Sequence, residues 1–455
     1  MYSWLPPFMY PAYERFTGRR FWSLTQQLLS LQWRSPKELQ ARAEVRLQLL
    51  LRHAYEHVPY YRQLFQHLGM VPDDVRSSGQ FSALPITSKR QLRAHFPTQV
   101  VADNLPSQRR RVAKTSGSSG VPLEFFTDVG ARDVRAASLD FFRTLAGISA
   151  ADSQIAITSP REHPRAQPLQ EHLRRLVTGS SSRYLSVLDV TVASFCAALA
   201  GVSSFYLHGY PSYIARLARE LERQGPRLGK FPKVVLTDSE TLTPPEAQQI
   251  TRLFRCPVAV HYESHEFQSM ALSCPDNPRI LHVNSESILL EIVTEEGQPA
   301  PMGERGRVII TDLHNYVMPF IRYDIGDTAI VGEPCPCGRG LPTLEGLEGR
   351  STEQLRTPQG AIITPAILGE LVFKRQNFLA YVAEYQAVRT TADMVVLKIV
   401  PMDGFTHDTA AALHTAVKRL LGPEMQVALD LVSQIPREAN GKRLIIKSQI
   451  ATASP

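Results

Sequence analysis

The sequence has only five cysteines in 455 residues, and it lacks any apolar run of the roughly 18 residues that a membrane-spanning helix needs. A small, odd number of cysteines argues against a disulfide framework and favours a reducing compartment, so we expect a cytoplasmic protein. The first residues lack the basic and then apolar pattern of a signal peptide. Internal repeats and low-complexity tracts are also lacking. From these absences we expect neither a membrane span nor a small disulfide scaffold.

What the sequence does contain is the composition of an ordinary globular protein, with 43% hydrophobic and 20% charged residues. At roughly 150 residues per domain, its length allows two or three domains. Lys and Arg exceed Asp and Glu by 50 to 43, which gives a net charge of +7. Such a mild excess suits anionic small molecules such as nucleotides as well as it suits nucleic acid, so the charge alone decides little. A nucleic-acid partner would rest on this charge alone, without aromatic and basic motifs, so we expect none.

Short β-branched runs alternate with amphipathic helices in the middle of the chain. The runs lie at 155–158, 234–237 and 258–260. This alternation predicts an α/β fold with mostly parallel sheets. Between 287 and 311, two β-branched stretches flank a turn-rich segment, which predicts a hairpin in a smaller β-region.

Two helices are indicated by the spacing of their apolar residues. In the helix expected at 211–225, Ser212 is a candidate N-cap and Gly225 ends the helix. In the helix expected at 37–58, four apolar residues at helical spacing are expected to share one face. They are Val45, Leu49, Leu50 and Ala54.

A glycine-rich loop is the strongest local motif. Its residues are Thr115, Ser116, Gly117, Ser118, Ser119 and Gly120. The glycines let the backbone approach a ligand closely, and successive N–H groups and hydroxyls can surround an anion such as a polyphosphate. The loop is not a Walker loop, because it has no Gly-Lys-Ser/Thr ending. A flexible surface loop beside charged residues is the alternative interpretation.

Five motifs follow one another along the chain. They are the loop at 115–120, Tyr262–Glu266, Arg322–Asp327, Gly349–Arg350 and Asn440–Lys442. In this order they resemble the motifs of adenylate-forming enzymes, the acyl-CoA synthetase superfamily. The flanking segments VPYYRQLFQHLG, LPITSKRQL, HGYPSYI and CPCGRG are similar to the phenylacetate-CoA ligase and CapK-like branch. The resemblance covers nearly the whole chain.

This resemblance implies an α/β enzyme with a large N-terminal adenylation domain, residues 1–349, and a small mobile α+β C-terminal domain, residues 350–455, on a hinge. Within the larger domain it implies a helical segment at about 1–100 and a β-subdomain at about 275–349. The implied reaction starts when a carboxylic acid, for which an aromatic acid is one candidate, attacks Mg-ATP to give an acyl-adenylate and pyrophosphate. CoA, a carrier protein, an amine or an alcohol then displaces AMP. A non-catalytic, adenylate-binding relative in a polysaccharide or secondary-metabolite pathway is the alternative.

The resemblance also implies nucleotide-binding residues. The loop at 115–120 would hold the β- and γ-phosphates, and Tyr262 would stack near the adenine. Asp327 would accept hydrogen bonds from the ribose hydroxyls, and Glu240 belongs to a turn near the adenine. Capping of a turn is the alternative for Asp327, since Gly-Asp is common in turns.

Three further residues would act in catalysis. Glu266 would coordinate Mg²⁺, a hard cation that prefers carboxylate oxygen. Lys442 would bring a compact positive charge between the carboxylate and the α-phosphate. Arg350 would assist at the ribose or the hinge. The alternatives are an exposed strand-end acid for Glu266 and a solvated lysine, beside Arg443 and Lys447, for Lys442.

Four residues depart from the pattern of the superfamily. Leu123 stands where most members have lysine, which agrees with the phenylacetate-type branch. Glu263 and His265 replace a glycine and a hydroxyl residue beside the nucleotide, where His265 could donate to phosphate when protonated. Thr352 replaces an Asp or Lys at the hinge. Glu263 and His265 are the only support for the non-catalytic alternative.

Three cysteines and one histidine form a candidate structural zinc site. They are Cys274, His282, Cys335 and Cys337. Three thiolates and one imidazole match a closed tetrahedral site, and free thiols are the alternative. The other two cysteines, Cys196 and Cys256, lie among apolar residues and are expected to pack in the core.

An acyl pocket is the last candidate site, with Tyr206, His208 and Tyr210 as its candidate residues. Tyr206 ends a strand-like stretch, and His208 and Tyr210 lie between this stretch and the helix at 211–225, a common place for a pocket. Core or loop roles are the alternatives for these three residues.

Overall fold

The computed structural model describes residues 9–75, 78–106, 110–115, 123–159, 175, 177–187, 190–225, 228–350, 353–359, 361–438 and 443–450. The chain forms two compact units, each built from separate segments. The first unit comprises Met1–Asp152, Ala166–Ser181 and Ala259–Leu347. The second unit comprises Ser153–Arg165, Ser182–Val258 and Glu348–Pro455. Among the described residues, no helix combines the length and apolarity that crossing a bilayer requires.

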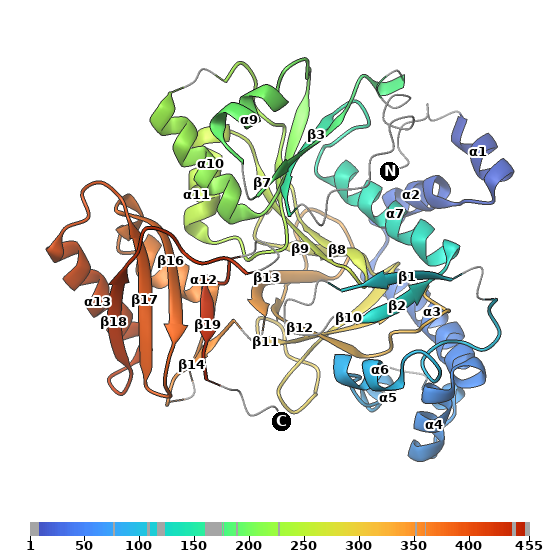
Figure 1. The fold of residues 1–455 in the computed structure, drawn as a ribbon. Coiled ribbons are helices and arrows are strands. Elements are labelled where there is room, and N and C mark those ends of the chain that lie inside the picture. Colours follow the sequence, from blue (N-terminus) through green and yellow to red (C-terminus); the bar gives the residue numbers. More distant parts are fainter. Residues whose placement is uncertain are drawn as a thin grey trace. The chain divides into compact units, whose positions relative to one another are not determined.

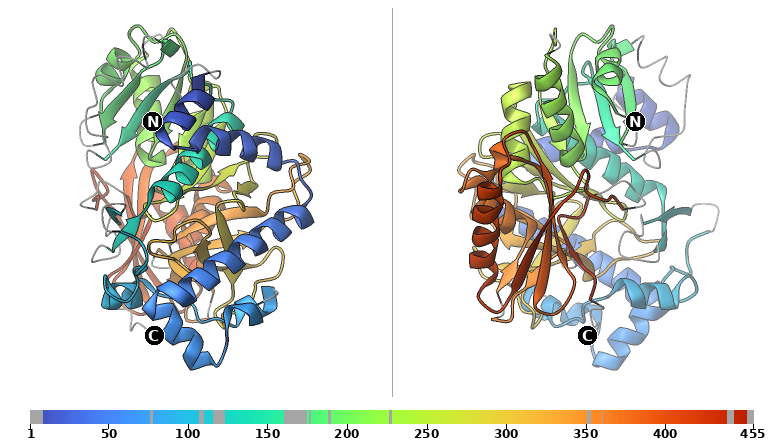
Figure 2. Two further views of the ribbon diagram at one scale, coloured as in Figure 1. Left: turned by 90° about the vertical axis from the view of Figure 1, so that its right-hand side faces the viewer. Right: turned by 60° about the vertical axis from the view of Figure 1, so that its left-hand side comes forward.

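Helices make up the N-terminal part of the first unit. They are α1 (Tyr10–Thr17), α2 (Phe21–Leu31), α3 (Pro36–His57), α4 (Pro59–Leu68), η2 (Pro72–Asp74), α5 (Ser78–Ser82), α6 (Lys89–His95) and α7 (Val129–Leu145). The long helix α3 begins at a capping box, in which Ser35 and Glu38 satisfy each other's backbone N–H groups. Figure 2 shows α3 and α4 in blue.

The buried face of α3 differs from the one predicted. Leu50 and Ala54 are buried as expected, but Val45 and Leu49 are 63% and 53% exposed. The buried stripe instead continues through Leu39, Ala43, Leu47 and Leu51. At 3.6 residues per turn, Val45 and Leu49 point away from this stripe, so the predicted set combined residues from opposite sides of the helix.

Antiparallel strands make up the rest of the first unit. A two-stranded hairpin joins β1 (Arg111–Lys114) to β2 (Glu124–Thr127). A larger sheet has the order β10-β11-β12-β13-β9-β8-β7. Its strands are β7 (Val258–Ser264), β8 (Gln268–Ser273), β9 (Leu281–Val283), β10 (Ile288–Val293), β11 (Arg305–Asp312), β12 (Tyr323–Val331) and β13 (Thr343–Arg350). The pairing of Ile288 with Asp312 and of Val293 with Arg307 confirms the hairpin predicted between 287 and 311.

Parallel strands form the sheet of the second unit, in the order β6-β5-β3-β4. The strands are β3 (Ser153–Thr158), β4 (Ser182–Ser186), β5 (Phe205–Gly209) and β6 (Val235–Thr237), and the helices are α9 (Val192–Ala198), α10 (Pro211–Gln224) and α11 (Pro244–Phe254). Figure 1 shows α10 and α11 side by side. Gly225 ends α10 with φ +64°, as predicted, but the N-cap is Tyr210 and not Ser212, because Pro211 already occupies the first turn.

The C-terminal lobe, residues 355–448, is the α+β part of the second unit. Its four-stranded sheet has the order β18-β17-β16-β19, and α13 packs against it through Leu413, Ala416, Val417 and Leu421 (Figures 1 and 2). These elements are β16 (Val382–Arg389), β17 (Met394–Pro401), α13 (His407–Leu421), β18 (Gln426–Leu431) and β19 (Ile446–Ser448). Shorter elements precede them, namely β14 (Leu355–Arg356), β15 (Ile362–Ile363), α12 (Pro365–Leu368), η4 (Gly369–Lys374) and η5 (Phe378–Ala380). The predicted α/β class with a small α+β C-terminal region is thus confirmed.

Candidate functional site

Two of the predicted nucleotide-binding residues meet in the first unit. The hydroxyl of Tyr262, in β7, donates a hydrogen bond of 2.7 Å to Oδ2 of Asp327, in β12. Gly326, with φ +82°, precedes Asp327, and the carboxylate that caps its N–H is that of Asp324, at 2.9 Å. Asp324 therefore caps this turn, and the carboxylate of Asp327 orients the ring of Tyr262.

The predicted magnesium ligand, Glu266, is a buried acid. It lies in the turn between β7 and β8 and is 7% exposed, so the alternative of an exposed strand-end acid does not hold. The hydroxyl of Tyr323 donates to its Oε1 at 3.3 Å. Its neighbour His265 is exposed. A carboxylate oxygen is a donor of the kind that Mg²⁺ takes.

Arg322, the first residue of the Arg322–Asp327 motif, has a structural role. It has φ +46°, is 1% exposed and pairs with Glu291 at 3.1 Å. Its guanidinium also donates to the carbonyl oxygens of Ser82 and Leu84. Burial raises the pKa of Glu291, and the charge of Arg322 opposes this rise. Arg322 therefore fixes the start of β12, the strand that carries Asp327.

The glycine-rich loop is described only at its base. The N–H of Thr115 donates to the carbonyl oxygen of Leu123 at 3.0 Å, and the N–H of Leu123 donates to the Thr115 hydroxyl at 2.9 Å. These two bonds close the β1–β2 hairpin below the loop. Several predicted site residues lie outside the described part of the chain, namely Ser116, Gly117, Ser118, Ser119, Gly120 and Lys442, together with the side chain of Arg350.

The three residues predicted for the acyl pocket lie in the second unit and differ in burial. Tyr206 and Tyr210 are buried, and Tyr210 belongs to the apolar core. His208 is partly exposed, and its Nε2 lies 2.5 Å from Oδ2 of Asp238, just after β6. Gln154 lies 3.3 Å from the other ring nitrogen of His208. Their assignment to an acyl pocket stays a prediction.

Glu240 makes contacts that the sequence did not indicate. Its Oε1 accepts a hydrogen bond of 2.6 Å from the N–H of Arg443, and its Oε2 accepts one of 3.3 Å from the N–H of Ser212. Burial raises the pKa of Glu240, and the nearby charge of Arg443 opposes this rise. Arg443, considered a solvated neighbour of Lys442, is 6% exposed and forms an ion pair with Glu246.

The three cysteines and the histidine of the candidate zinc site come together in the first unit. Their ligand atoms all lie within 4.8 Å of one another. The sulfurs of Cys274 and Cys335 are 3.7 Å apart, and the sulfur of Cys337 is 3.3 Å from Nε2 of His282. A disulfide would bring two sulfurs to about 2.05 Å. With zinc–sulfur bonds of about 2.3 Å, tetrahedral coordination would separate them by about 3.8 Å. The spacing therefore fits a tetrahedral zinc ion.

The ionisation of these side chains is also compatible with a metal. Burial lowers the pKa of His282 to about 4, so its imidazole is neutral at pH 7. Burial opposes ionisation of Cys337, but hydrogen bonds from the backbone and side chain of Arg339 lower the pKa of its thiol overall. Burial raises the pKa of Cys335 to about 12 in the metal-free protein. A bound cation would reverse this, since a coordinated thiol is deprotonated.

The CPCGRG segment also holds the junction between α2 and α3. Arg339 lies over the ring of Trp33 at 4.7 Å and donates to the side chain of Gln32 at 2.9 Å. The N–H of Gly340 donates to the carbonyl oxygen of Gln32 at 2.9 Å. A Cβ atom at Gly340 would lie 1.8 Å from the carbonyl oxygen of Arg34, so only glycine fits here.

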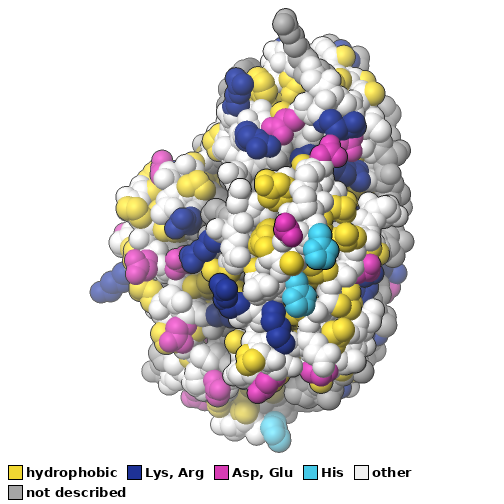
Figure 3. Space-filling view, turned by 90° about the vertical axis from the view of Figure 1, so that its left-hand side faces the viewer, with side chains coloured by type: hydrophobic (Ala, Val, Ile, Leu, Met, Phe, Trp, Pro, Cys, Tyr) yellow, Lys and Arg dark blue, Asp and Glu magenta, His cyan; other side chains and the backbone are white. Residues whose placement is uncertain are grey.

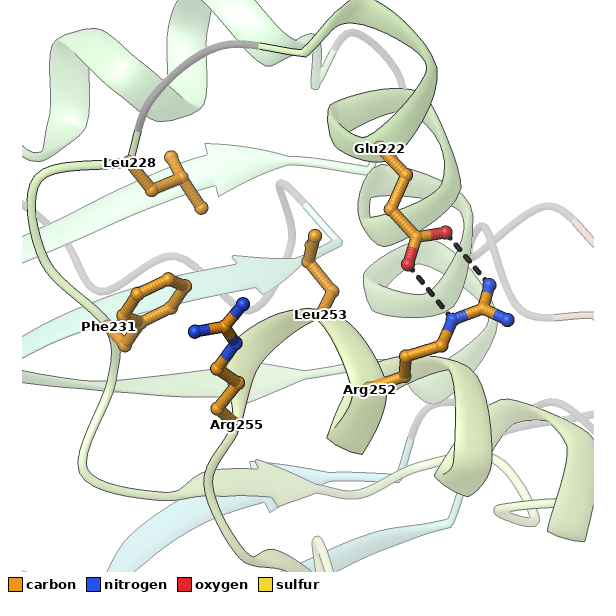
Figure 4. Close-up of a pocket in the computed structure, with 6 residues that line it drawn as sticks. All are labelled: Glu222, Leu228, Phe231, Arg252, Leu253 and Arg255. Atoms are coloured by element: carbon orange, nitrogen blue, oxygen red, sulfur yellow. Dashed lines mark hydrogen bonds and ion pairs between the residues drawn. The ribbon is translucent and has the colours of Figure 1, made fainter.

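A surface pocket of about 350 Å³ lies in the second unit and contains none of the predicted site residues. Figure 4 shows the bidentate ion pair of Arg252 with Glu222 on one side and Arg255 beside Phe231 on the other. Elsewhere on the surface, the face in Figure 3 carries basic side chains among acidic, apolar and histidine side chains.

Known proteins resemble this chain over most of its length. Residues 355–449 match the CapK C-terminal domain. The chain is 25% identical over 446 residues to a phenylacetate-coenzyme A ligase of Thermus thermophilus, covering 90% of this chain and 96% of that protein. It is also 25% identical over 428 residues to the phenylacetate-coenzyme A ligase of Escherichia coli, covering 89% of this chain and 93% of that protein.

A solved structure shares the fold. It is that of a 2-hydroxyisobutyryl-CoA ligase in the postadenylation state, in complex with R3-HIB-AMP. The TM-score is 0.71 at 21% identity, and the match covers 90% of this chain and 89% of that chain. The resemblance read from the motifs is confirmed: the chain is similar to phenylacetate-coenzyme A ligases over most of its length, and its residues 355–449 match the CapK C-terminal domain.

Proposed function

We propose that this protein is an AMP-forming ligase that activates a small carboxylic acid with Mg-ATP and passes the acyl group to CoA. The observation that carries this proposal is the 2.7 Å hydrogen bond between Tyr262 and Asp327, which unites two motifs that are 65 residues apart in the sequence. The names of the relatives favour an aromatic acid such as phenylacetate. A carrier protein is the second acceptor to be tested.

The first step brings two anions together, and the proposed residues reduce the resulting repulsion. The N–H groups and hydroxyls of the loop at 115–120 would hold the terminal phosphates. Asp327 would accept hydrogen bonds from the ribose while it keeps the ring of Tyr262 oriented toward the adenine. Lys442 would neutralise charge that develops between the acid and the α-phosphate.

Glu266 is the residue that would hold the magnesium ion. Its carboxylate is buried and bonded only on Oε1 among the described contacts, which leaves Oε2 for a hard cation. The cation supplies positive charge to the phosphates. Arg350, at the end of β13, would assist at the ribose or at the hinge that precedes the C-terminal domain. We keep the limits 350–455 proposed for this domain.

A screen of carboxylic acids for ATP-dependent pyrophosphate release, with and without CoA, tests the proposal. Release with at least one acid, and a thioester when CoA is present, would support it. ATP binding without pyrophosphate release for any acid would instead indicate the non-catalytic, adenylate-binding alternative. Glu263 and His265, which depart from the superfamily pattern, would then be the residues to examine.

Asp327→Ala is expected to raise the KM for ATP about 10- to 150-fold, because a hydrogen bond to a charged group contributes about 1.5–3 kcal/mol. Tyr262→Phe keeps the ring but removes the hydroxyl, so its effect should be smaller. Initial rates at varied ATP concentration measure both effects, and thermal unfolding controls for folding. An unchanged KM in Asp327→Ala would remove this residue from the nucleotide site.

We also propose that Cys274, His282, Cys335 and Cys337 hold a structural zinc ion. All four ligands come from the protein, so no coordination position remains for a substrate. The site would fasten the CPCGRG segment and, through Arg339, the junction of α2 and α3. Reduced thiolates suit a cytoplasmic location, which we propose for this protein.

A further inference from the structure

The surface pocket of the second unit combines apolar side chains with a cation. Its volume is about 350 Å³, toward the lower end of the range for small-molecule sites. It is lined by Glu222, Leu228, Phe231, Arg252, Leu253 and Arg255. In Figure 4, Leu228 and Phe231 come from the loop after α10, and Leu253 and Arg255 come from the end of α11. The pocket is therefore formed mainly by two helix-to-strand connections of one unit.

Only one of the two arginines in the pocket has its charge matched by an acid. Arg252 donates two hydrogen bonds to the carboxylate of Glu222, at 3.0 and 2.8 Å. The guanidinium of Arg255 lies 5.8 Å from the centre of the Phe231 ring, and no carboxylate among the described residues pairs with it. The sequence of segment 223–233 contains four basic residues and no acidic one. An unmatched positive charge beside an aromatic ring is complementary to an anion with an apolar body.

The backbone conformation of Arg255 is unusual for an arginine. This residue ends α11 in the left-handed region, with φ +51°, and its N–H donates to the carbonyl oxygen of Thr251 at 2.9 Å. Glycine is favoured at such a position because a side chain there is strained, and Gly225 ends α10 in this way. Strained residues of this kind cluster at binding sites. The strain at Arg255 is therefore an independent indication that its side chain is used.

The pocket lies at the amino edge of the parallel sheet. Phe231 precedes β6, and two residues later the N–H of Lys233 donates to the carbonyl oxygen of Phe205, the first residue of β5, at 2.9 Å. His208, which was predicted for the acyl pocket, lies near the other end of β5. Substrates of open α/β sheets usually bind beyond the carboxyl ends of the strands. The pocket is therefore separate from the place predicted for the acid.

We propose that this pocket is a second binding site, for a small organic anion with an aromatic or aliphatic body. The carboxylate or phosphate of the ligand pairs with Arg255, and its apolar body packs on Leu228, Phe231 and Leu253. The ion pair on the other side of the pocket forms a neutral, polar rim. This inference does not depend on the proposed function, because none of these residues belongs to the proposed nucleotide or acid site.

A ligand-detected NMR titration of the full-length protein tests the site with three naphthalene probes. They are 2-naphthoate, 2-naphthyl phosphate and the uncharged 2-naphthamide. We expect at least one of the two anions to bind with a Kd of about 1 mM or below, as the size of these probes allows. The amide should bind about 5- to 10-fold more weakly, because it cannot form a charge-assisted hydrogen bond with Arg255. The difference between the two anions shows which anionic group the site prefers.

Two variants assign the binding to this pocket. Arg255→Gln should weaken the binding of the anions about 5- to 10-fold and leave that of 2-naphthamide unchanged. Phe231→Ala should weaken the binding of all three probes, because it removes the ring against which they pack. Arg419→Gln is the matched control, since Arg419 is an exposed arginine in the last turn of α13. It should behave as wild type.

Three results would overturn the inference. They are the absence of anion binding at probe concentrations up to about 10 mM, equal affinity for the anions and the amide, and unchanged anion affinity in Arg255→Gln or Phe231→Ala. None of them affects the proposed function, which the screen for pyrophosphate release tests separately. A wild-type protein that releases no pyrophosphate with any acid would refute that function and leave the binding result as it stands.

Discussion

Replacing Lys442 with alanine is expected to slow acyl-adenylate formation about 100- to 1,000-fold, the cost of losing one group that stabilises developing charge. The attack of a carboxylate on a phosphate brings two negative centres together, and the ammonium group is the compact positive charge placed between them. The second half-reaction starts from a mixed anhydride, whose leaving group is already activated. Transfer from supplied acyl-adenylate to CoA should therefore change little.

Acid-dependent ATP–pyrophosphate exchange measures the first step, and thioester formation from synthetic acyl-adenylate measures the second. Lys447→Ala serves as the control, because that lysine contacts Glu438 at the surface. A loss of the same size in both steps would contradict the role given to Lys442.

Replacing Cys335 with serine is expected to release one zinc ion per chain and to destabilise the first unit. A ligand that binds only the folded state stabilises it by about 4 kcal/mol when its free concentration exceeds the Kd about 1,000-fold. The loss should be largest near α2 and α3, because Arg339 and Gly340 contact Gln32. Metal analysis of the purified protein and thermal unfolding with and without a chelator measure these effects.

Cys196→Ser is the matched control for the zinc site, since Cys196 is a free, partly buried cysteine packed beside the core of the second unit. It should keep the metal and nearly all of the stability. Wild-type protein without bound zinc, or chelation without any fall in unfolding temperature, would reject the metal and leave a cluster of free thiols.

The motifs, read through the resemblance and through the types of metal ligand, indicated which residues belong to one site. The pairing of Tyr262 with Asp327 and the approach of Cys274 to Cys335 join residues that the motifs already marked. The face of α3 was only partly anticipated. Val45 and Leu49 were assigned to the buried side because they are apolar, although at 3.6 residues per turn they lie opposite the stripe that is buried.

Contacts between unmarked residues could not be anticipated. Arg443 and Glu246 are 197 residues apart, and each is a common surface residue type in isolation. Only the fold shows that both are buried. In the same way, the two units combine separate segments of the chain, and no local composition indicates that residues 182–258 pack with residues 348–455. The proposed domain boundary at 349 and 350 followed from the resemblance alone.

The carboxylate of Glu246, in the first turn of α11, has a consequence for how the second unit tolerates substitution. Thr243 holds this carboxylate through two hydrogen bonds, so the acid would keep its orientation in a variant that lacks the guanidinium of Arg443. The capping of α11 and the ion pair to Arg443 are therefore separable: loss of the arginine should leave the start of the helix ordered, whereas loss of the glutamate should weaken both.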